Sequence, residues 1–493
     1  MATQSTLPPA TRAEQTGFEE TSRYADVRRF IDELAATAGS LRVESFGKSE
    51  EGRDLPLLVV GDPSIAAPQQ AIASRRPIIF AMANIHAGEV EGKEALLHLA
   101  RRLTLGDLRP LARGAVWLLA PIYNADGNER IGSENRREQN GPIGGVGTRE
   151  NALGLDLNRD FIKLESAEAQ ALVGLLNKWN PDLVIDLHTT NGSYHGYHLT
   201  YAPSLNPNAD PRLTAFLRQR LLPSVTRAMS SKHGLRTYYY GNFSTAESPG
   251  DELSLPDSSG ASPTVWRTFD HRPRFGNNYV GLRNRLAILS EAYSYLDFTN
   301  RVRATEAFVE EIGRFVIANA SNVQALINRV EADWLRGASA TEGGVAFDIR
   351  PLAEPARILV GAVEKRSNPR TGTDMLAMIE RTATPMRMLE YGAFAATTTR
   401  RMPRAYVIAP SASGVDRTIA GKLKAHGARV GELTAATRVT VERFVVESVS
   451  RSEPSFQGHN EVSVTGRFER ADTDLPAGTL VIGTDQPLGR LIF

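Results

Sequence analysis

His86 and Glu89 have residue types and a spacing that could hold a metal ion. They lie three residues apart, after a short apolar run and before a helical pattern. From a strand-to-helix turn, an imidazole and a carboxylate at this spacing can reach one cation. One more histidine from another strand would complete a two-histidine, one-carboxylate site that leaves a position for water. On its own, the pair also fits a surface histidine beside a glutamate that the helix dipole favours, because such short motifs occur by chance.

Polar groups follow several short apolar runs at the point where each run ends. The segments are 83–89, 121–127, 186–190 and 290–293, and their polar residues include His86, Glu89, His188 and Glu291. In open α/β sheets, ligands bind at the carboxyl ends of the strands, near a topological switch. We therefore expect these groups to converge on one site that can bind a metal or move protons.

Apolar runs alternate with helical patterns from residue 23 to about residue 334. The predicted strands are 55–60, 78–83, 115–120, 183–187 and 286–289, and the predicted helices are 24–38, 91–105, 166–179, 211–233 and 302–334. Because the apolar runs are short and show little polar alternation, they are typical of strands covered on both faces. The pattern predicts an α/β fold in which a mixed sheet is flanked by helices.

The chain length of 493 residues favours two domains. We expect 1–22 to be a flexible N-terminal segment, 23–336 the domain that carries the chemistry, 337–344 a linker of small polar residues, and 345–493 a smaller β-rich C-terminal domain of unknown role. Segments 439–449 and 462–468 alternate as strands do, and 415–428 is a helix candidate. No residue pattern in this tail indicates chemistry.

Composition excludes several classes of protein and site. The chain has 57 Lys and Arg against 56 Asp and Glu, for a net charge of +1, which argues against nucleic acid as a partner. No apolar run approaches the ~20 residues that a membrane span requires. The absence of cysteine excludes disulfides, thiolate metal sites and cysteine nucleophiles, so any metal must be held by His, Asp or Glu.

The compartment is not fixed by these features. Residues 1–21 lack the apolar core of a signal peptide. We expect a secreted or periplasmic protein if a signal peptide has been removed, and a cytoplasmic protein otherwise. The oligomeric state is not readable from the sequence.

A series of motifs then occurs in a fixed order along the chain. The motifs are His86-Ala-Gly-Glu89, Asn124-Ala-Asp-Gly127, the stretch from Arg149 to Asp160 with its Asp-Leu-Asn-Arg core, His188, and Glu291. The series resembles the zinc carboxypeptidase family typified by carboxypeptidase A, over about residues 23–334. The resemblance implies an eight-stranded type of mixed sheet flanked by helices.

The resemblance also implies roles for the matching residues. His86, Glu89 and His188 would bind one Zn²⁺ per chain. Glu291 would be the general base, taking a proton from the zinc-activated water and passing it to the leaving amine. Arg149 would stabilise the tetrahedral oxyanion beside the metal.

Three further residues take roles by the same resemblance. Asn158 and Arg159 would hold the terminal carboxylate of the substrate, since a planar guanidinium binds a carboxylate through two hydrogen bonds. Asp156 would accept a hydrogen bond from a zinc-bound imidazole and orient it.

Two departures from the family concern substrate recognition. Gly88 stands where carboxypeptidase A has an arginine directly before the glutamate ligand. The mobile pocket tyrosine of the family has no clear match; Tyr279 is one candidate substrate-binding residue, and the run Tyr238-Tyr239-Tyr240 is another.

Structural interpretations of these residues stay open at this point. Arg149 follows a glycine-rich loop and also fits solvated surface, and Glu291 also fits a buried carboxylate that has a partner. His195 and His198 lie in an aromatic segment that fits either a pocket wall or an ordinary strand.

The sequence thus predicts a zinc metallocarboxypeptidase that hydrolyses the C-terminal peptide bond of peptides. One alternative is hydrolysis of cell-wall peptides or another small amide at the same site. Another is a non-catalytic zinc-binding relative that acts as a binding module. The presence of both Glu291 and Arg149 argues against the last alternative, because a degenerate site would usually lack one of them.

Overall fold

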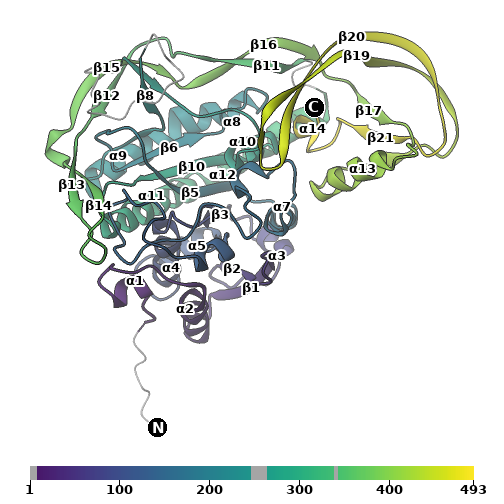
Figure 1. Ribbon diagram of the computed structural model, residues 1–493. Helices are drawn as coiled ribbons and strands as arrows, with labels where there is room; N and C mark the ends of the chain where they lie inside the picture. The colour runs from purple at the N-terminus through teal and green to yellow at the C-terminus, as the bar shows by residue number, and fades with distance from the viewer. Residues whose placement is uncertain (1–7, 246–263, 338–341) are drawn as a thin grey trace.

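The computed structural model describes residues 8–245, 264–337 and 342–493, and its largest layer is an eight-stranded mixed sheet (Figure 1). The strand order is β1-β2-β4-β3-β5-β10-β6-β7. The strands are β1 (Leu41–Lys48), β2 (Asp54–Val60), β3 (Ile78–Ala83), β4 (Val116–Ala120), β5 (Leu183–Thr190), β6 (Leu199–Pro203), β7 (Thr237–Tyr239) and β10 (Leu286–Tyr293). The four central strands β4, β3, β5 and β10 run parallel, whereas β2 and β6 pair with them in the antiparallel sense.

Helices cover both faces of this sheet, as the sequence predicts (Figure 1). One face packs against α2 (Tyr24–Thr37), α4 (Glu91–Thr104), α9 (Leu222–His233), α11 (Phe298–Ala318) and α12 (Ala320–Leu335), and the other against α7 (Ala167–Trp179) and α10 (Gly276–Leu282). Successive strand residues point to opposite faces. In β3, Ile79 and Ala81 join the first apolar cluster, while Phe80 and Met82 join the second.

Shorter helices connect these layers. They are α1 (Arg12–Gln15), α3 (Pro68–Ala73), α5 (Arg109–Gly114), α6 (Ala125–Glu129), α8 (Pro211–Phe216), a 3₁₀ turn at Leu157–Arg159 and another at Glu380–Thr382. A π-helical turn at Leu217–Leu221 joins α8 to α9. Within the described ranges, no helix combines the length and apolar character needed to cross a membrane.

The helix predicted at 302–334 is two helices, because α11 ends at Ala318 and α12 starts at Ala320. Asn319 stands between them with non-helical φ of −118° and ψ of 20°. Its side-chain Nδ2 donates to the carbonyl of Phe315 at 2.9 Å, and the same carbonyl accepts from the backbone N–H of Asn319 at 3.0 Å. The side chain of Asn319 thus hydrogen-bonds to the backbone of α11, and its non-helical φ and ψ separate α11 from α12.

The C-terminal region is rich in β-structure, as expected, but it is built from small sheets. The pairs are β11 (Glu342–Arg350) with β16 (Ala393–Arg401), β13 (Val363–Ser367) with β14 (Asp374–Met378), β19 (Thr437–Phe456) with β20 (His459–Leu475), and β21 (Leu480–Gly483) with β17 (Ala405–Ile408) and β18 (Gly431–Glu432). Helices α13 (Val415–Ala425) and α14 (Gly489–Ile492) accompany them.

One sheet of the C-terminal region also contains strands from the first region. It is four-stranded, with β12 (Ala356–Val360) and β15 (Thr384–Tyr391) beside β9 (Val265–Arg267) and β8 (Asn242–Ser244). Leu389 in β15 pairs with Val265 in β9. The two regions are therefore joined by backbone hydrogen bonds as well as by the chain between them.

The segment predicted as a linker, 337–344, is described only in part, because 338–341 lie outside the described residues. Residues 342–344 are not linker but the start of β11, paired with β16. A Cβ at Gly343 would collide with the ring of Phe493, and one at Gly344 with the ring of Phe347. The glycines are thus explained by close packing of aromatic rings on the strand, not by flexibility.

The N-terminal segment was expected to be flexible, but the described part of it, residues 8–22, packs on α4. Glu94 of α4 is buried, and its carboxylate accepts hydrogen bonds from Thr21 Oγ1, Ser22 N and Ser22 Oγ at 2.7–2.9 Å. A buried carboxylate requires such partners. The hydrogen bonds from Thr21 and Ser22 to the buried Glu94 carboxylate therefore hold the N-terminal segment against α4.

His98 on α4 links the same segment to α11. Its Nε2 lies 3.4 Å from Glu14 Oε1, and its Nδ1 lies 3.6 Å from Glu306 Oε2. Burial acts to lower the pKa of His98, but the two carboxylates outweigh it and raise the pKa to about 9. The protonated imidazole thus binds the N-terminal segment to the helical layer.

We expect this interaction to stabilise the fold below about pH 6.5, the unfolded-state pKa of histidine, and to fade as the pH rises through 9. Urea unfolding of the wild type and of His98→Gln checks this at pH 6.5 and pH 9.5. The wild type should be more stable by on the order of 2 kcal/mol at the lower pH, and the difference should shrink at the higher pH. A difference that stays constant would contradict the assignment.

Candidate metal centre

The register of the central strands brings the candidate ligands together. His188 in β5 and Glu291 in β10 are direct partners across the parallel pair, so their side chains emerge side by side on the same face. The chain turns sharply after β3 at Asn84, which has φ of +64°. Asparagine tolerates this left-handed conformation better than most residues. The turn leads to His86 and Glu89, which precede α4.

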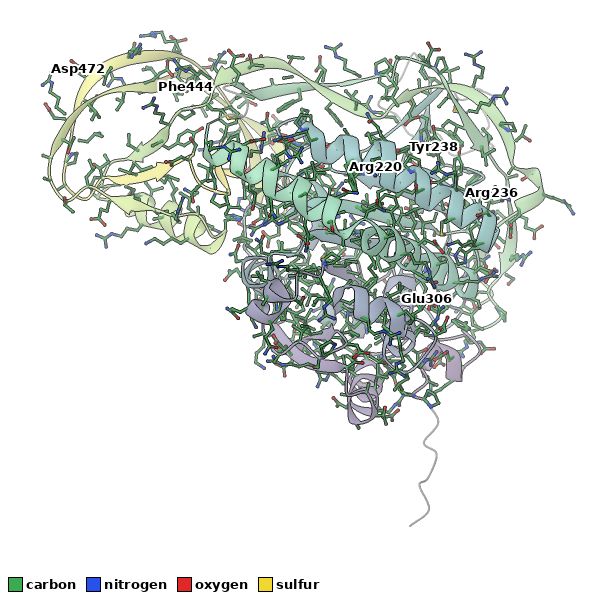
Figure 2. All side chains as sticks on the ribbon, turned by 180° about the vertical axis from the view of Figure 1, so that it is seen from behind. Arg220, Arg236, Tyr238, Glu306, Phe444 and Asp472 are labelled. Carbon is green, nitrogen blue, oxygen red and sulfur yellow. The ribbon has the colours of Figure 1, made fainter. Side chains whose placement is uncertain are left out.

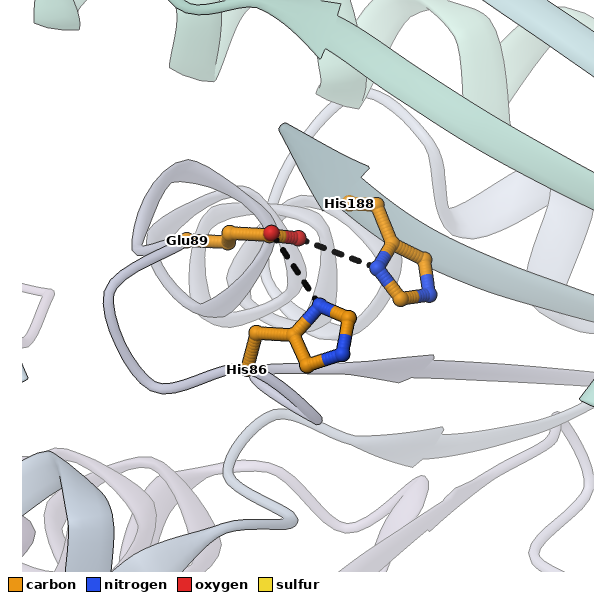
Figure 3. Close-up of side chains that lie close together, drawn as sticks. All are labelled: His86, Glu89 and His188. Atoms are coloured by element: carbon orange, nitrogen blue, oxygen red, sulfur yellow. Dashed lines mark hydrogen bonds and ion pairs between the residues drawn. The ribbon is translucent and has the colours of Figure 1, made fainter. Parts of the chain in front are cut away.

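The three side chains predicted as ligands converge in one buried cluster (Figure 3). His86 Nδ1 lies 3.1 Å from Glu89 Oε1, and His188 Nδ1 lies 3.0 Å from Glu89 Oε2. One ligand atom from each residue lies within 4.8 Å of the others. Each is at most 4% exposed, so a cation would be shielded from bulk water.

Each imidazole has a carboxylate at its other nitrogen. His86 Nε2 lies 3.0 Å from Asp156 Oδ1, and His188 Nε2 lies 2.9 Å from Asp186 Oδ2. A carboxylate at this position holds the proton on Nε2 and leaves the Nδ1 lone pair for a metal. Asp156 was predicted in this place, whereas Asp186 was not assigned a role. Its position two residues before His188 on one strand, hence on the same face, was the available signal.

The donor set fits a zinc ion in its chemistry: two imidazole nitrogens and one carboxylate, with no thiolate. Burial acts to raise the pKa of Glu89, but His86 and Arg136 outweigh it and hold the pKa well below its usual value. Glu89 is therefore the anion that such a site requires. Within the described ranges, this is the group of His, Asp and Glu side chains that could hold a metal ion.

Glu291 lies in the wall of the cavity that opens onto these ligands. Burial raises the pKa of its carboxyl to about 8, with His188 acting against the shift and Glu89 adding to it. The position and chemistry of Glu291 suit general acid–base catalysis.

The stretch from Arg149 to Arg159 wraps around the same cluster. Arg149 donates to Asp156 Oδ2 from Nε and Nη2 at 3.0 and 2.8 Å, and its Nη1 lies 3.3 Å from His86 Nδ1. Asn158 Nδ2 lies 3.4 Å from His188 Nε2, and its Oδ1 accepts from the backbone of Gly276 at 3.0 Å. Arg159 stacks on the ring of Phe275, 4.0 Å from its centroid.

Arg136 is a further cation at this site that the sequence analysis missed. Its Nη1 lies 3.1 Å from Glu89 Oε1, its Nη2 donates to the carbonyl of Thr189 at 2.8 Å, and its Nε donates to Gln139 at 2.9 Å. A Cβ at Gly88 would lie only 2.8 Å from Arg136 Cδ. Gly88 thus makes room for Arg136, which brings a guanidinium from the loop before Arg149. The sequence gives no local signal for this contact, because Gly88 and Arg136 lie 48 positions apart along the chain.

The cavity has a volume of about 160 Å³ and a mostly polar wall. It is lined by His86, Glu89, Arg136, Arg149, Asn158, Arg159, His188, Thr189, Thr190, Asn191, Tyr240, Phe269, Phe275, Asn277, Leu289 and Glu291. Three arginines in one small cavity favour an anionic ligand. Seven of the predicted site residues therefore meet in one place, with Asp156 directly behind His86.

Tyr279, predicted as a substrate-binding residue, does not line the cavity. It is fully buried in α10, and its hydroxyl lies 2.9 Å from His426 Nδ1 and accepts from Arg283 at 3.2 Å. The helix turns this side chain to the opposite face of the sheet, so the prediction is corrected. Tyr240, from the other candidate run, lines the cavity instead. His195 is buried against Tyr293, with ring centroids 4.0 Å apart, and lies outside the cavity wall.

Comparison with known proteins agrees with this geometry. Residues 27–263 match the family model described as zinc carboxypeptidase. Carboxypeptidase 2 of Trichophyton tonsurans is 23% identical over 467 residues, which cover 90% of this chain and 76% of the relative. Carboxypeptidase Z of Mus musculus is 34% identical over 150 residues, which cover 29% of this chain and 22% of the relative.

Solved structures similar to this chain include two carboxypeptidases. A metallo-carboxypeptidase from Pseudomonas aeruginosa, in complex with (2-guanidinoethylmercapto)succinic acid, is 22% identical with a TM-score of 0.41, covering 62% of this chain and 71% of that one. Carboxypeptidase A from Helicoverpa armigera is 15% identical with a TM-score of 0.41, covering 62% and 75%. On the family match and the relatives that share its sequence, residues 27–263 carry a zinc carboxypeptidase domain, and the chain is a zinc metallopeptidase.

Proposed function

We propose that this metallocarboxypeptidase removes the C-terminal residue of peptides, with Glu291 as the general base and Arg159 as the anchor of the substrate carboxylate. The observation that carries the proposal is one cavity lined by a His-Glu-His group, by Glu291, and by Asn158 and Arg159. Glu291 lies beyond the residues that match the family model, so its role rests on its place beside His188.

The residues of this cluster divide the work of amide hydrolysis. Zinc held by His86, Glu89 and His188 would supply a Lewis acid that lowers the pKa of water and polarises a carbonyl. Glu291 accepts a proton at its carboxylate from the attacking water and later donates it to the nitrogen of the leaving amine. Burial raises the pKa of Glu291 to about 8 without a bound cation, and the positive charge of a bound metal would lower it toward the carboxylate form that accepts a proton.

Charge on the other wall of the cavity suits the substrate and its oxyanion. Arg149 reaches toward His86 while Asp156 holds its guanidinium, so a fixed positive charge lies beside the metal group. Arg159 and Asn158 also line the cavity and offer a terminal carboxylate a guanidinium and an amide. Arg136 adds a third positive charge, which further favours an anionic chain end.

Glu291→Gln should lower kcat by about 100-fold or more, because the amide cannot accept the proton from water. The variant should still bind one zinc per chain, measured by metal analysis after dialysis. Glu364→Gln, which changes an exposed carboxyl on β13, is the matched control and should keep full activity. Unchanged turnover in Glu291→Gln would exclude Glu291 as the base.

Amidation of the substrate's C-terminus should lower kcat/KM by about 10- to 100-fold, because a charged hydrogen bond to Arg159 is lost. Arg159→Gln should raise KM for the free acid and remove most of the preference for acid over amide. Paired peptides that differ only in the terminal group provide the measurement. Equal cleavage of both by the wild type would contradict carboxypeptidase action and favour an endopeptidase or small-amide hydrolase.

Asp186→Asn should weaken zinc binding by about 10- to 100-fold, because His188 would lose the carboxylate that fixes its tautomer. Competition with a chromophoric chelator measures the affinity, and thermal unfolding checks that the fold is kept. Asp107→Asn, an exposed residue paired with Arg102, is the control. Unaltered zinc affinity would show that His188 needs no such partner.

A further inference from the structure

The β19–β20 hairpin reaches from the C-terminal region back to the peptidase domain (Figure 1). Its ladder runs from Thr437 paired with Leu475 at the base to Phe456 paired with His459 at the tip. Most of its residues are exposed along both strands, and Phe444 and Asp472 stand on the part that arches away from the body (Figure 2). In Figure 1 the ribbon then descends, and its tip lies beside α10.

Contacts at the tip attach the hairpin to two segments of the peptidase domain. His459 Nε2 lies 2.6 Å from Glu165 Oε1, in the loop that precedes α7. Arg272 Nη1 lies 3.6 Å from Glu461 Oε1, and the guanidinium of Arg274 lies over the ring of Phe456, 5.8 Å from its centroid. An isolated two-stranded ribbon is marginal in stability, so these contacts define where the tip sits.

The contact with Arg274 continues as a column of stacked side chains into the cavity. Arg274 also lies over Phe275, 5.3 Å from the ring centroid, and Arg159 lies over the same ring at 4.0 Å. Phe275 and Arg159 line the cavity, whereas Phe456 and Arg274 stand outside it. The order from the tip to the site is Phe456, Arg274, Phe275, Arg159.

The same segment holds the neighbour of Arg159. The backbone N–H of Gly276 donates to Asn158 Oδ1 at 3.0 Å, so residues 274–276 contact both members of the proposed carboxylate anchor. Arg274 and Arg159 carry like charges beside one aromatic ring, and their repulsion opposes the arrangement. Asp270, 3.2 Å from Arg274 Nη2, and the ring of Phe456 are the groups that hold Arg274 in place.

We propose that Phe456 at the tip of the β19–β20 hairpin is a positioning residue for substrate recognition: by packing on Arg274 it fixes residues 274–276, and through them the orientation of Arg159 and Asn158. The proposal rests on the function proposed above, in that Arg159 holds the substrate's carboxylate. The C-terminal region thereby contributes to affinity without touching substrate. The metal ligands and Glu291 lie on other segments, namely the turn before α4 and the strands β5 and β10, so we expect the effect on KM and not on kcat.

Phe456→Ala in the full-length zinc enzyme tests this. Loss of one cation–π contact should raise KM for an N-acylated dipeptide acid by about three- to tenfold, with kcat within about twofold of the wild type. Phe456→Tyr keeps the ring and should restore KM. Val449→Ala, an exposed position on the same hairpin, is the control and should change neither constant. The matching dipeptide amide should show no rise in KM in Phe456→Ala, because it lacks the group that Arg159 holds.

Arg274→Lys supplies a second, independent variant, since it keeps the charge but removes the flat guanidinium that stacks on both rings. It should reproduce the rise in KM, and the double variant with Phe456→Ala should add little to either single change, as expected for residues acting in one column. A rise in KM equal for acid and amide, or a fall in kcat with KM unchanged, would overturn the positioning role.

Arg159→Gln separates failure of this inference from failure of the proposed function. If Arg159→Gln raises KM for the acid while Phe456→Ala does not, the anchor stands and the hairpin has no part in it. If neither variant changes KM for the acid, the carboxylate is held elsewhere and both proposals fall.

Discussion

The burial of one carboxylate, Glu89, is the constraint on which the rest of the site depends. An unpaired charge at this depth would cost on the order of several kcal/mol, so the fold must bring partners to it. The partners come from different elements: His86 from its own loop, the imidazole of His188 and the backbone N–H of Thr189 from β5, and Arg136 from the loop that follows α6. A bound cation would replace some of this compensation, because the same two imidazoles and carboxylate are its ligands.

Much of the site could be predicted because the parallel sheet simplifies the geometry. In a parallel array the carboxyl ends of strands meet at one edge, so polar residues after apolar runs were sufficient to group His86, Glu89, His188 and Glu291. Tyr279 and Arg136 show where this reasoning stops. The direction of Tyr279 depends on the rotation of a short helix, and Arg136 reaches Glu89 from a loop without regular structure. Neither follows from a strand pattern.

In the fold, too, elements set by local apolar patterns could be predicted, whereas features set by tertiary contacts could not. Several strands and helices of the main sheet were predicted almost to the residue, as β3 (78–83) and α7 illustrate, because their apolar patterns are local. The strands β1, β6 and β7 were not predicted, and β5 and β10 extend beyond their predicted ends. The break at Asn319, the strand at Gly343 and Gly344, and the packing of residues 8–22 were not predicted. Two of these features depend on hydrogen bonds of a polar side chain, Asn319 and Glu94, and the third depends on the space taken by the rings of Phe493 and Phe347.

The strand pairing between β9 and β15 has a consequence for the order in which the protein can be completed during synthesis. Val265 leaves the ribosome 124 residues before its partner Leu389, which corresponds to roughly 6 to 25 seconds of translation. During that interval β9 presents an unpaired edge, which is a template for wrong pairing with other chains. The hairpin tip beside Arg274 is made later still. On the positioning role proposed for Phe456, the nascent peptidase domain would carry its metal ligands well before the wall of its substrate cavity is held in place, and recognition of substrate would be the last property that the growing chain acquires.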